Sequence, residues 1–148
     1  MKSAYYIALI LLVVSVGIQF VPTKLNQIEA IPKTDFLLVN NTPNDIGVLL
    51  LSSCYDCHSN NTNYPWYSKI QPIAWFLEGH IKEGKSELNF SEWANYSDRR
   101  KNSKLKSIIS QIQDDKMPLL SYTIMHSDAV LSNSDKIKTI DYINQINR

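Results

Sequence analysis

Two cysteines and a histidine stand close enough together in the sequence to share one chemical task. They form Cys54-Tyr55-Asp56-Cys57-His58, a C-x-x-C-H motif, and these two cysteines are the only ones in the 148-residue chain. In this pattern the thiols attach covalently to the vinyl groups of a haem, and the adjacent imidazole becomes an axial ligand of its iron. The motif therefore predicts one covalent haem c, held through Cys54, Cys57 and His58.

The same cysteines allow two other interpretations. A disulfide between Cys54 and Cys57 is compatible with an oxidising compartment, but a redox dithiol is usually accompanied by a βαβ pattern that this sequence lacks. A zinc site needs a fourth ligand, normally from a second C-x-x-C or an H-x-x-x-H group, and the chain contains neither. Haem is therefore the leading interpretation.

The second axial ligand of the iron is less defined, because three side chains compete for it and the choice sets the redox potential. Met117 is the leading candidate, since Pro118 disfavours helical geometry at Met117 and lets its thioether point inward. His80 is the alternative and would give a bis-histidine site of lower potential. His126 is a weaker candidate in an expected surface loop. An iron without a second protein ligand would instead be open to small molecules or peroxide.

Helices must position these side chains, and the spacing of apolar residues predicts four of them. They run from about Pro43 into Cys54, from Pro72 to Gly84, from Ser97 to Ile112, and from a cap at Ser132 or Ser134 towards Ile146. No stretch alternates as a strand does, so we predict an all-α, small cytochrome c-like domain.

Aromatic residues are dense between the motif and the third predicted helix. They include Tyr64, Trp66, Trp75 and Trp93. Such side chains most often fill a core, but they also suit the apolar wall that a haem needs. We expect both uses here.

The N-terminus reads as a membrane-spanning or signal segment. An almost unbroken apolar run extends from Ala4 to Phe20, and no convincing cleavage site follows it closely. We therefore predict a signal anchor over residues 1–22, with a cleaved signal peptide as the alternative, then a linker over 23–40 and the domain over 41–148. Either form places the cysteines outside the cytoplasm, where thiols do not stay reduced for long.

The charge balance excludes one class of partner. With 15 basic and 14 acidic residues the chain has a formal net charge of +1, which gives no broad positive field for nucleic acid. The partners that we expect are the membrane, through the N-terminal segment, and redox proteins that exchange electrons with the domain.

Several further motifs surround C-Y-D-C-H-S at Cys54 to Ser59. They are N-x-T-x-Y-P-W-Y ending at Tyr67, a Trp75 to Lys85 segment containing His80, L-N-F-S-E-W from Leu88 to Trp93, and the late Met-Pro followed by Tyr122 and His126. Together they resemble the haem-binding domain family, a small cytochrome c-like family of Bacteroidetes-type bacteria. The resemblance implies covalent haem on Cys54, Cys57 and His58 and a location on the periplasmic side of the inner membrane, anchored there or free in the periplasm. It implies no reaction, and it leaves Met117 and His80 both open as ligands.

Two functions fit these expectations. One-electron transfer needs no general acid, base or nucleophile, and the residues near the motif form no catalytic cluster, so we expect an electron carrier and not an enzyme. The alternative is a haem sensor or peroxidase-like protein whose sixth iron position is open or exchangeable, with His80 as an acid or base group on that side.

Overall fold

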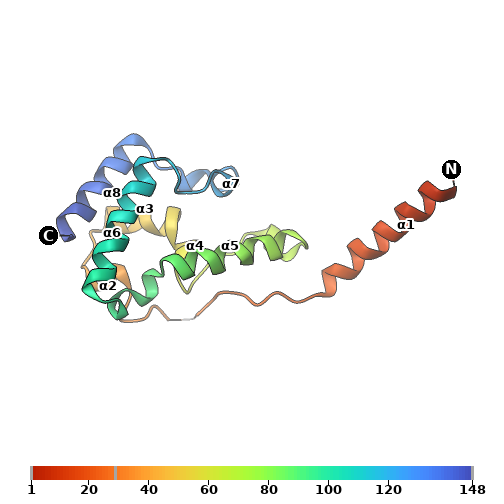
Figure 1. The fold of residues 1–148 in the computed structure, drawn as a ribbon, viewed down its shortest axis with the longest axis horizontal. Coiled ribbons are helices and arrows are strands. Elements are labelled where there is room, and N and C mark those ends of the chain that lie inside the picture. The colour runs from red at the N-terminus through yellow and green to blue at the C-terminus, as the bar shows by residue number, and fades with distance from the viewer. Residues whose placement is uncertain (1, 29, 148) are drawn as a thin grey trace.

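A computed structural model describes residues 2–28 and 30–147 of the protein, and its regular elements are helices (Figure 1). The α-helices are α1 (Lys2–Gly17), α2 (Phe36–Val39), α3 (Asn44–Leu50), α4 (Asp56–His58), α5 (Ile73–Glu87), α6 (Asp98–Gln113), α7 (Leu120–Thr123) and α8 (Asn133–Ile146). Shorter 3₁₀ or π segments lie between them: η1 (Ile18–Phe20), η2 (Leu51–Tyr55), η3 (Trp66–Lys69), η4 (Phe90–Asn95) and η5 (Ser127–Ala129). No strand forms within the described ranges, which confirms the predicted all-α fold.

The long helices begin where the sequence places caps. Ser97 accepts a hydrogen bond from a first-turn N–H of α6, and Ser132 forms a capping box at the start of α8. α5 begins after Pro72 but continues to Glu87, past the glycine at which we expected it to end. Gly84 has no positive φ and therefore does not terminate the helix. A close backbone contact, described below, accounts for this glycine instead.

An aromatic core lies behind the C-x-x-C-H segment. Phe36 meets Phe90 and Trp93 edge to face, with ring centroids 5.2 Å and 4.9 Å apart respectively. Tyr55 stacks on Phe90 at 5.0 Å, with the two rings almost parallel. Such pairs add stability beyond the apolar area that they bury. Phe36 belongs to α2, so the segment expected to be a linker contributes a fully buried side chain to the core.

The other aromatic residues singled out in the sequence lie nearer the surface. Trp66 is 72% exposed and Trp75 is 41% exposed, whereas Trp93 is only 2% exposed. The hydroxyl of Tyr64 donates to Glu78. Only one of the three tryptophans is therefore a core residue.

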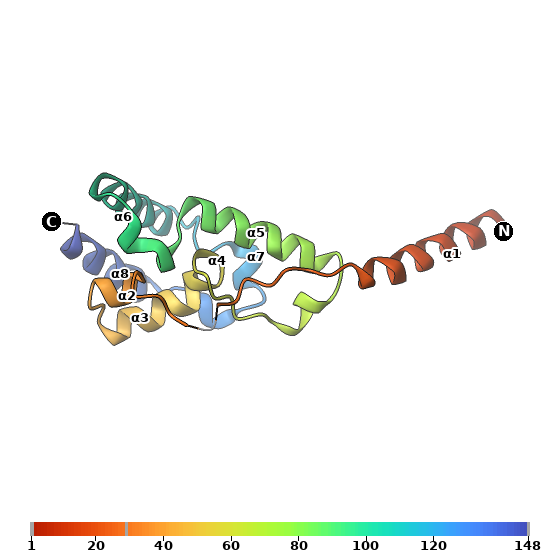
Figure 2. The ribbon, with the colours of Figure 1, turned by 90° about the horizontal axis from the view of Figure 1, so that it is seen from below.

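The apolar helix α1 projects away from the rest of the molecule (Figures 1 and 2). Together with η1 it forms a 19-residue helical segment with a mean hydropathy of 2.0, and none of it is buried in the protein. This segment is long and apolar enough to cross a membrane, and a signal sequence has the same properties.

Residues 19–28, which we call the strap, hold the end of this segment against the domain (Figure 2). Gln19 and Gln71 exchange hydrogen bonds, from Gln19 Nε2 to the Gln71 carbonyl at 3.1 Å and from the Gln71 N–H to Gln19 Oε1 at 3.0 Å. Further along, the Thr62 N–H donates to the Asn26 carbonyl at 2.9 Å, and Asn26 Nδ2 donates to Thr62 Oγ1 at 2.9 Å. The strap is therefore bonded to the domain over most of its length.

Candidate functional site

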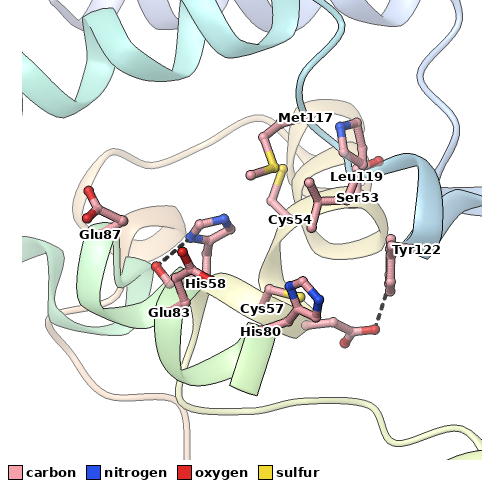
Figure 3. A pocket seen from close by; sticks show the side chains of 13 residues that line it. Ser53, Cys54, Cys57, His58, His80, Glu83, Glu87, Met117, Leu119 and Tyr122 are labelled. Atoms are coloured by element: carbon pink, nitrogen blue, oxygen red, sulfur yellow. Dashed lines mark hydrogen bonds between the residues drawn. The ribbon is translucent and has the colours of Figure 1, made fainter. Parts of the chain in front are cut away.

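Five side chains singled out in the sequence line a single cavity of about 250 Å³ (Figure 3). They are Cys54, Cys57, His58, His80 and Met117. They come from three places in the fold: the segment η2–α4, the middle of α5 and the chain just after α6. The fold thus brings the C-x-x-C-H motif together with both leading candidates for the second ligand.

Two adjoining cavities extend this space into what we call the recess. One, of about 380 Å³, shares Cys54, His58 and Met117 with the first cavity and reaches the apolar side of α6. The other, of about 340 Å³, shares Cys57 and His80 and leads outward between η3, α5 and α7. The walls of all three are predominantly apolar. This lining suits a flat, largely apolar cofactor.

A π-helical turn sets the direction of the motif side chains. The helix that we expected from Pro43 into Cys54 forms without a break, but its hydrogen bonding changes from α-helical in α3 to π-helical in η2 at Leu51. A π turn brings residues five apart onto one face, where an α-helix would bring residues four apart. Leu50 and Tyr55, which are five apart, both lie in the aromatic core. The extra residue leaves Cys54 and Cys57 on the recess side.

The imidazole of His58 is held by one of its ring nitrogens. Nδ1 lies 2.9 Å from the Gly84 carbonyl oxygen and 3.0 Å from the Leu88 carbonyl oxygen. Because both carbonyls are acceptors, Nδ1 carries the proton and Nε2 keeps its lone pair. Burial lowers the pKa of His58, which favours this neutral form. Metal-binding histidines are commonly oriented by such a carbonyl behind the ring.

Gly84 lets α5 approach the motif. A Cβ at this position would lie 2.7 Å from the carbonyl oxygen of Cys57 and 3.3 Å from its Cβ. A packed interior has no room for such an atom without moving the backbone. The carbonyl of the same glycine accepts the hydrogen bond from His58. One residue therefore sets both the distance of α5 from the motif and the orientation of the imidazole.

The two thiols share a weakly polar environment. Burial, followed by the proximity of Cys57, raises the pKa of the Cys54 thiol to about 12. Burial and then the nearby Asp56 raise the pKa of Cys57 to about 11. Both sulfurs are thus protonated at neutral pH, and both are free thiols.

A tight reversal after α6 brings Met117 to the recess. Asp115 adopts a left-handed conformation with a φ of 55°, which ends the helical direction of the chain. The N–H groups of Lys116 and Met117 then both donate to the Gln111 carbonyl, at 2.9 Å and 3.2 Å. Figure 3 shows the Met117 side chain directed into the recess from this turn.

The two remaining histidines have different surroundings. His80 lines the recess from α5, and its ring meets Phe76 edge to face at 4.4 Å. His126 lines none of the three cavities of the recess. Its Nε2 is hydrogen-bonded to the Tyr67 hydroxyl at 2.7 Å, and its ring stacks on Tyr122 at 4.3 Å. The structure therefore groups His80, but not His126, with the motif.

Some recess residues were missed from the sequence. Glu83 and Glu87 line the cavity from α5 together with His80. Glu83 lies three residues after His80 and four before Glu87, and this spacing puts side chains on one face of a helix. The sequence could therefore have identified the two glutamates. Tyr122 also lines the cavity, and its hydroxyl donates to Asp56 Oδ2 at 2.7 Å. Tyr122 belongs to the late motif that resembles the family, but no local pattern predicts its hydrogen bond to Asp56, which depends on how α7 packs on the motif.

The donor set of the recess fits a haem. It comprises two thiols, an imidazole nitrogen with a free lone pair and a thioether, all around apolar walls. Across residues 2–28 and 30–147 no group of three or more His, Cys, Asp or Glu side chains is arranged to hold a metal ion directly. A structural zinc site would require such a group.

Comparison with known proteins agrees with this chemistry. The profile of one family, described as a haem-binding domain, matches residues 13–145. No curated protein and no solved structure shows significant similarity to the chain. The family match covers the strap, the core and every recess residue named above. The chain therefore belongs to the haem-binding domain family, and its cofactor is haem.

Proposed function

We propose that the protein is a one-electron carrier with a single covalent haem c in the recess. The observation that carries the proposal is the state of His58, whose Nδ1 is hydrogen-bonded to two carbonyls while its ring lines the same cavity as both thiols. Cys54 and Cys57 would form the thioethers and His58 would be the first axial ligand. Haem bound in this way supplies iron that alternates between the ferrous and ferric states.

Met117 is the second axial ligand in this proposal. It shares two cavities with His58, whereas His80 shares only one of them. Its backbone is fixed by the reversal at Asp115, so little backbone freedom is lost when it becomes a ligand. His80 is the alternative ligand.

Electron transfer is favoured over catalysis by what lines the recess. Apart from the candidate ligands, the polar side chains that line the first cavity are those of Ser53, Asp56, Glu83, Glu87 and Tyr122, and the Tyr122 hydroxyl donates a hydrogen bond to Asp56. Burial raises the pKa of Tyr122, which keeps its phenol protonated, so this pair does not supply the activated nucleophile that covalent catalysis needs. Two fixed axial ligands would leave the residues around the iron to exclude water and to limit structural change between oxidation states.

The location that we propose is the periplasmic side of a bacterial inner membrane. Helix α1 and η1 are exposed, apolar and long enough to act as the anchor. Thioether bonds to haem would also protect both cysteines from oxidation to a disulfide outside the cytoplasm, where free thiols do not stay reduced. The partners would then be redox proteins at or near the same membrane.

Optical spectra of the full chain, exported in a host that matures c-type cytochromes, test the proposal. A sharp reduced α-band that survives denaturing extraction shows covalent haem, and a weak far-red band in the oxidised protein shows sulfur ligation. Met117→Ala should abolish the far-red band, while the matched control Met125→Ala should keep it. A protein without haem absorption would contradict the whole proposal, and loss of the low-spin spectrum in His80→Ala alone would assign the second ligand to His80.

A second function is favoured by the position of His80. Its ring lines the same cavity as His58, so it could act as an acid or base group beside an open iron position. A sensor or peroxidase-like protein of this kind would be high-spin, and its spectrum would shift promptly with carbon monoxide. A spectrum that does not respond to carbon monoxide would exclude this second function.

A further inference from the structure

Large apolar side chains are exposed around the outer end of the recess. Four of them line its outermost cavity, and we call them the outer patch: Trp66, Ile73, Phe76 and Met125, exposed by 72%, 45%, 65% and 55%. A soluble domain rarely gathers apolar groups of this size on one surface unless something covers them.

The outer patch lies at the end of the domain to which the apolar N-terminal segment is bonded. The reciprocal bonds between Gln19 and Gln71 hold that segment two residues before Ile73. Gln71 Nε2 also donates to the Val21 carbonyl at 3.3 Å and to Thr23 Oγ1 at 3.1 Å. Figure 1 shows the end of α1 and the start of α5 at the same end of the domain.

The apolar N-terminal segment is just long enough to cross a bilayer, which places the domain directly against the membrane surface. Its 19 residues, at roughly 1.5 Å each, span about 28 Å, which is close to the hydrocarbon thickness of a membrane. Phe20 therefore stands at the membrane surface when α1 crosses it. Because Gln19 is bonded to Gln71, the start of α5 stands there too.

The chemistry of this surface matches a lipid interface. Tryptophan is enriched where hydrocarbon meets headgroups, and lysines pair there with phosphate. Trp66 is followed by the exposed Lys69, and the strap adds the exposed Lys24. The only acidic residue from 60 to 80 is Glu78, which accepts a hydrogen bond from the Tyr64 hydroxyl.

We propose that the outer patch docks on the bilayer that α1 crosses, so that the outer end of the recess opens against the lipid surface. The occupant of the patch is the phospholipid interface itself. The inference needs α1 to be kept as an anchor, and it does not depend on how haem is attached.

Photocrosslinking of the full chain in phospholipid nanodiscs tests this docking. Position 76 takes p-benzoyl-phenylalanine in place of Phe76, which is close in shape. The matched control carries it at Ser103, an exposed position on α6, and a positive control carries it at Val13 in α1. After irradiation, intact mass reports any added phospholipid, and haem absorbance is recorded separately on the same sample.

Docking predicts a phospholipid adduct at positions 76 and 13 and none at position 103. An adduct at 13 but not at 76 overturns the proposal, as does a crosslink from 76 to a second copy of the chain or to another protein. An intact mass that lacks α1 overturns it as well, because the anchor would be absent. Missing haem absorbance would instead count against the proposed function alone.

Discussion

The segment from Leu50 to His58 has one face packed in the aromatic core, which we call the filled side, and one face bordering the recess, which we call the open side. The two sides differ in packing and in the chemistry of their side chains. On the filled side, Tyr55 stacks on Phe90 within a core whose members are at most 8% exposed. On the open side, Cys54, Cys57 and His58 border a recess of apolar walls and possible ligands. The filled side stabilises the fold, whereas the open side is kept for a cofactor. Substitutions on the two sides should therefore have separable effects.

The largest expected effect is on the open side. His58→Ala should abolish normal haem ligation because it removes the nitrogen beside the thiols, while the helical circular dichroism of the protein should change little. Optical spectra of the oxidised and reduced protein measure this. His126→Ala is the matched control and should keep the parent spectrum, since that ring lies outside the recess. Unchanged low-spin spectra in His58→Ala would defeat the ligand assignment.

The filled side should respond to truncation with lost stability. Phe36→Ala should lower the free energy of unfolding by about 3–5 kcal/mol, because it removes a fully buried ring that contacts two others. Urea unfolding in detergent, followed by circular dichroism, measures the change. Phe76→Ala is the matched control, with a ring 65% exposed, and should change stability by no more than about 0.5 kcal/mol. Equal losses in the two variants would refute the assignment of Phe36 to the core.

Gly84→Ala should affect both sides at once, by lowering the stability of the fold and by disturbing the haem site. The added Cβ would press on the Cys57 carbonyl, so we expect about 1–3 kcal/mol of lost stability together with an altered haem spectrum. Gly79→Ala lies on the same helix with nothing within 4 Å of its Cβ, and it should leave the spectrum unchanged. Because alanine favours a helix more than glycine does, Gly79→Ala should stabilise the protein slightly. A normal spectrum in Gly84→Ala would show that the close contact does not position the motif.

The smallest expected effect concerns the pH dependence of the filled side. Burial raises the pKa of Asp35, although the Leu37 N–H and the Tyr55 hydroxyl both donate to this carboxylate. The unfolded chain therefore ionises first as pH rises from about 4, so stability falls until the folded-state pKa is passed and stays lower above it. Asp35→Asn keeps both acceptor contacts and should remove this fall. Urea unfolding at a series of pH values measures the slope, and an unchanged slope in the variant would contradict the explanation.

The sequence predicted the elements that depend on local patterns. The starts of α5, α6 and α8 follow from Pro72, Ser97 and Ser132, because caps and proline act on adjacent backbone. The all-α fold and the haem-binding family are confirmed. The ligand roles of the motif, Met117 and His80 stay predictions, although the structure brings all of these side chains to one cavity.

Glu83 and Glu87 were missed although their helical spacing signals them, whereas the other features that escaped prediction depend on how segments pack together. Phe36 is a core residue only because η4 supplies Phe90 and Trp93 to meet it. Gly84 resembles a helix terminator in sequence, and only the packing of α5 against Cys57 reveals another reason for it. The π turn likewise leaves no signal in the composition of residues 51–55.

That π turn makes the length of the segment as important as its composition. Because the π turn holds one residue more than an α-helical turn would, deleting one residue such as Ser52 would leave Leu50 and Tyr55 four apart, the spacing that an α-helix brings onto one face. Such a deletion should keep the ring of Tyr55 in the core and the thiols on the recess side. An inserted residue would instead turn everything after it by about 100° relative to α3, so that either the ring would leave the core or the thiols would leave the recess. The segment should therefore tolerate the loss of a single codon in the π turn far better than the gain of one.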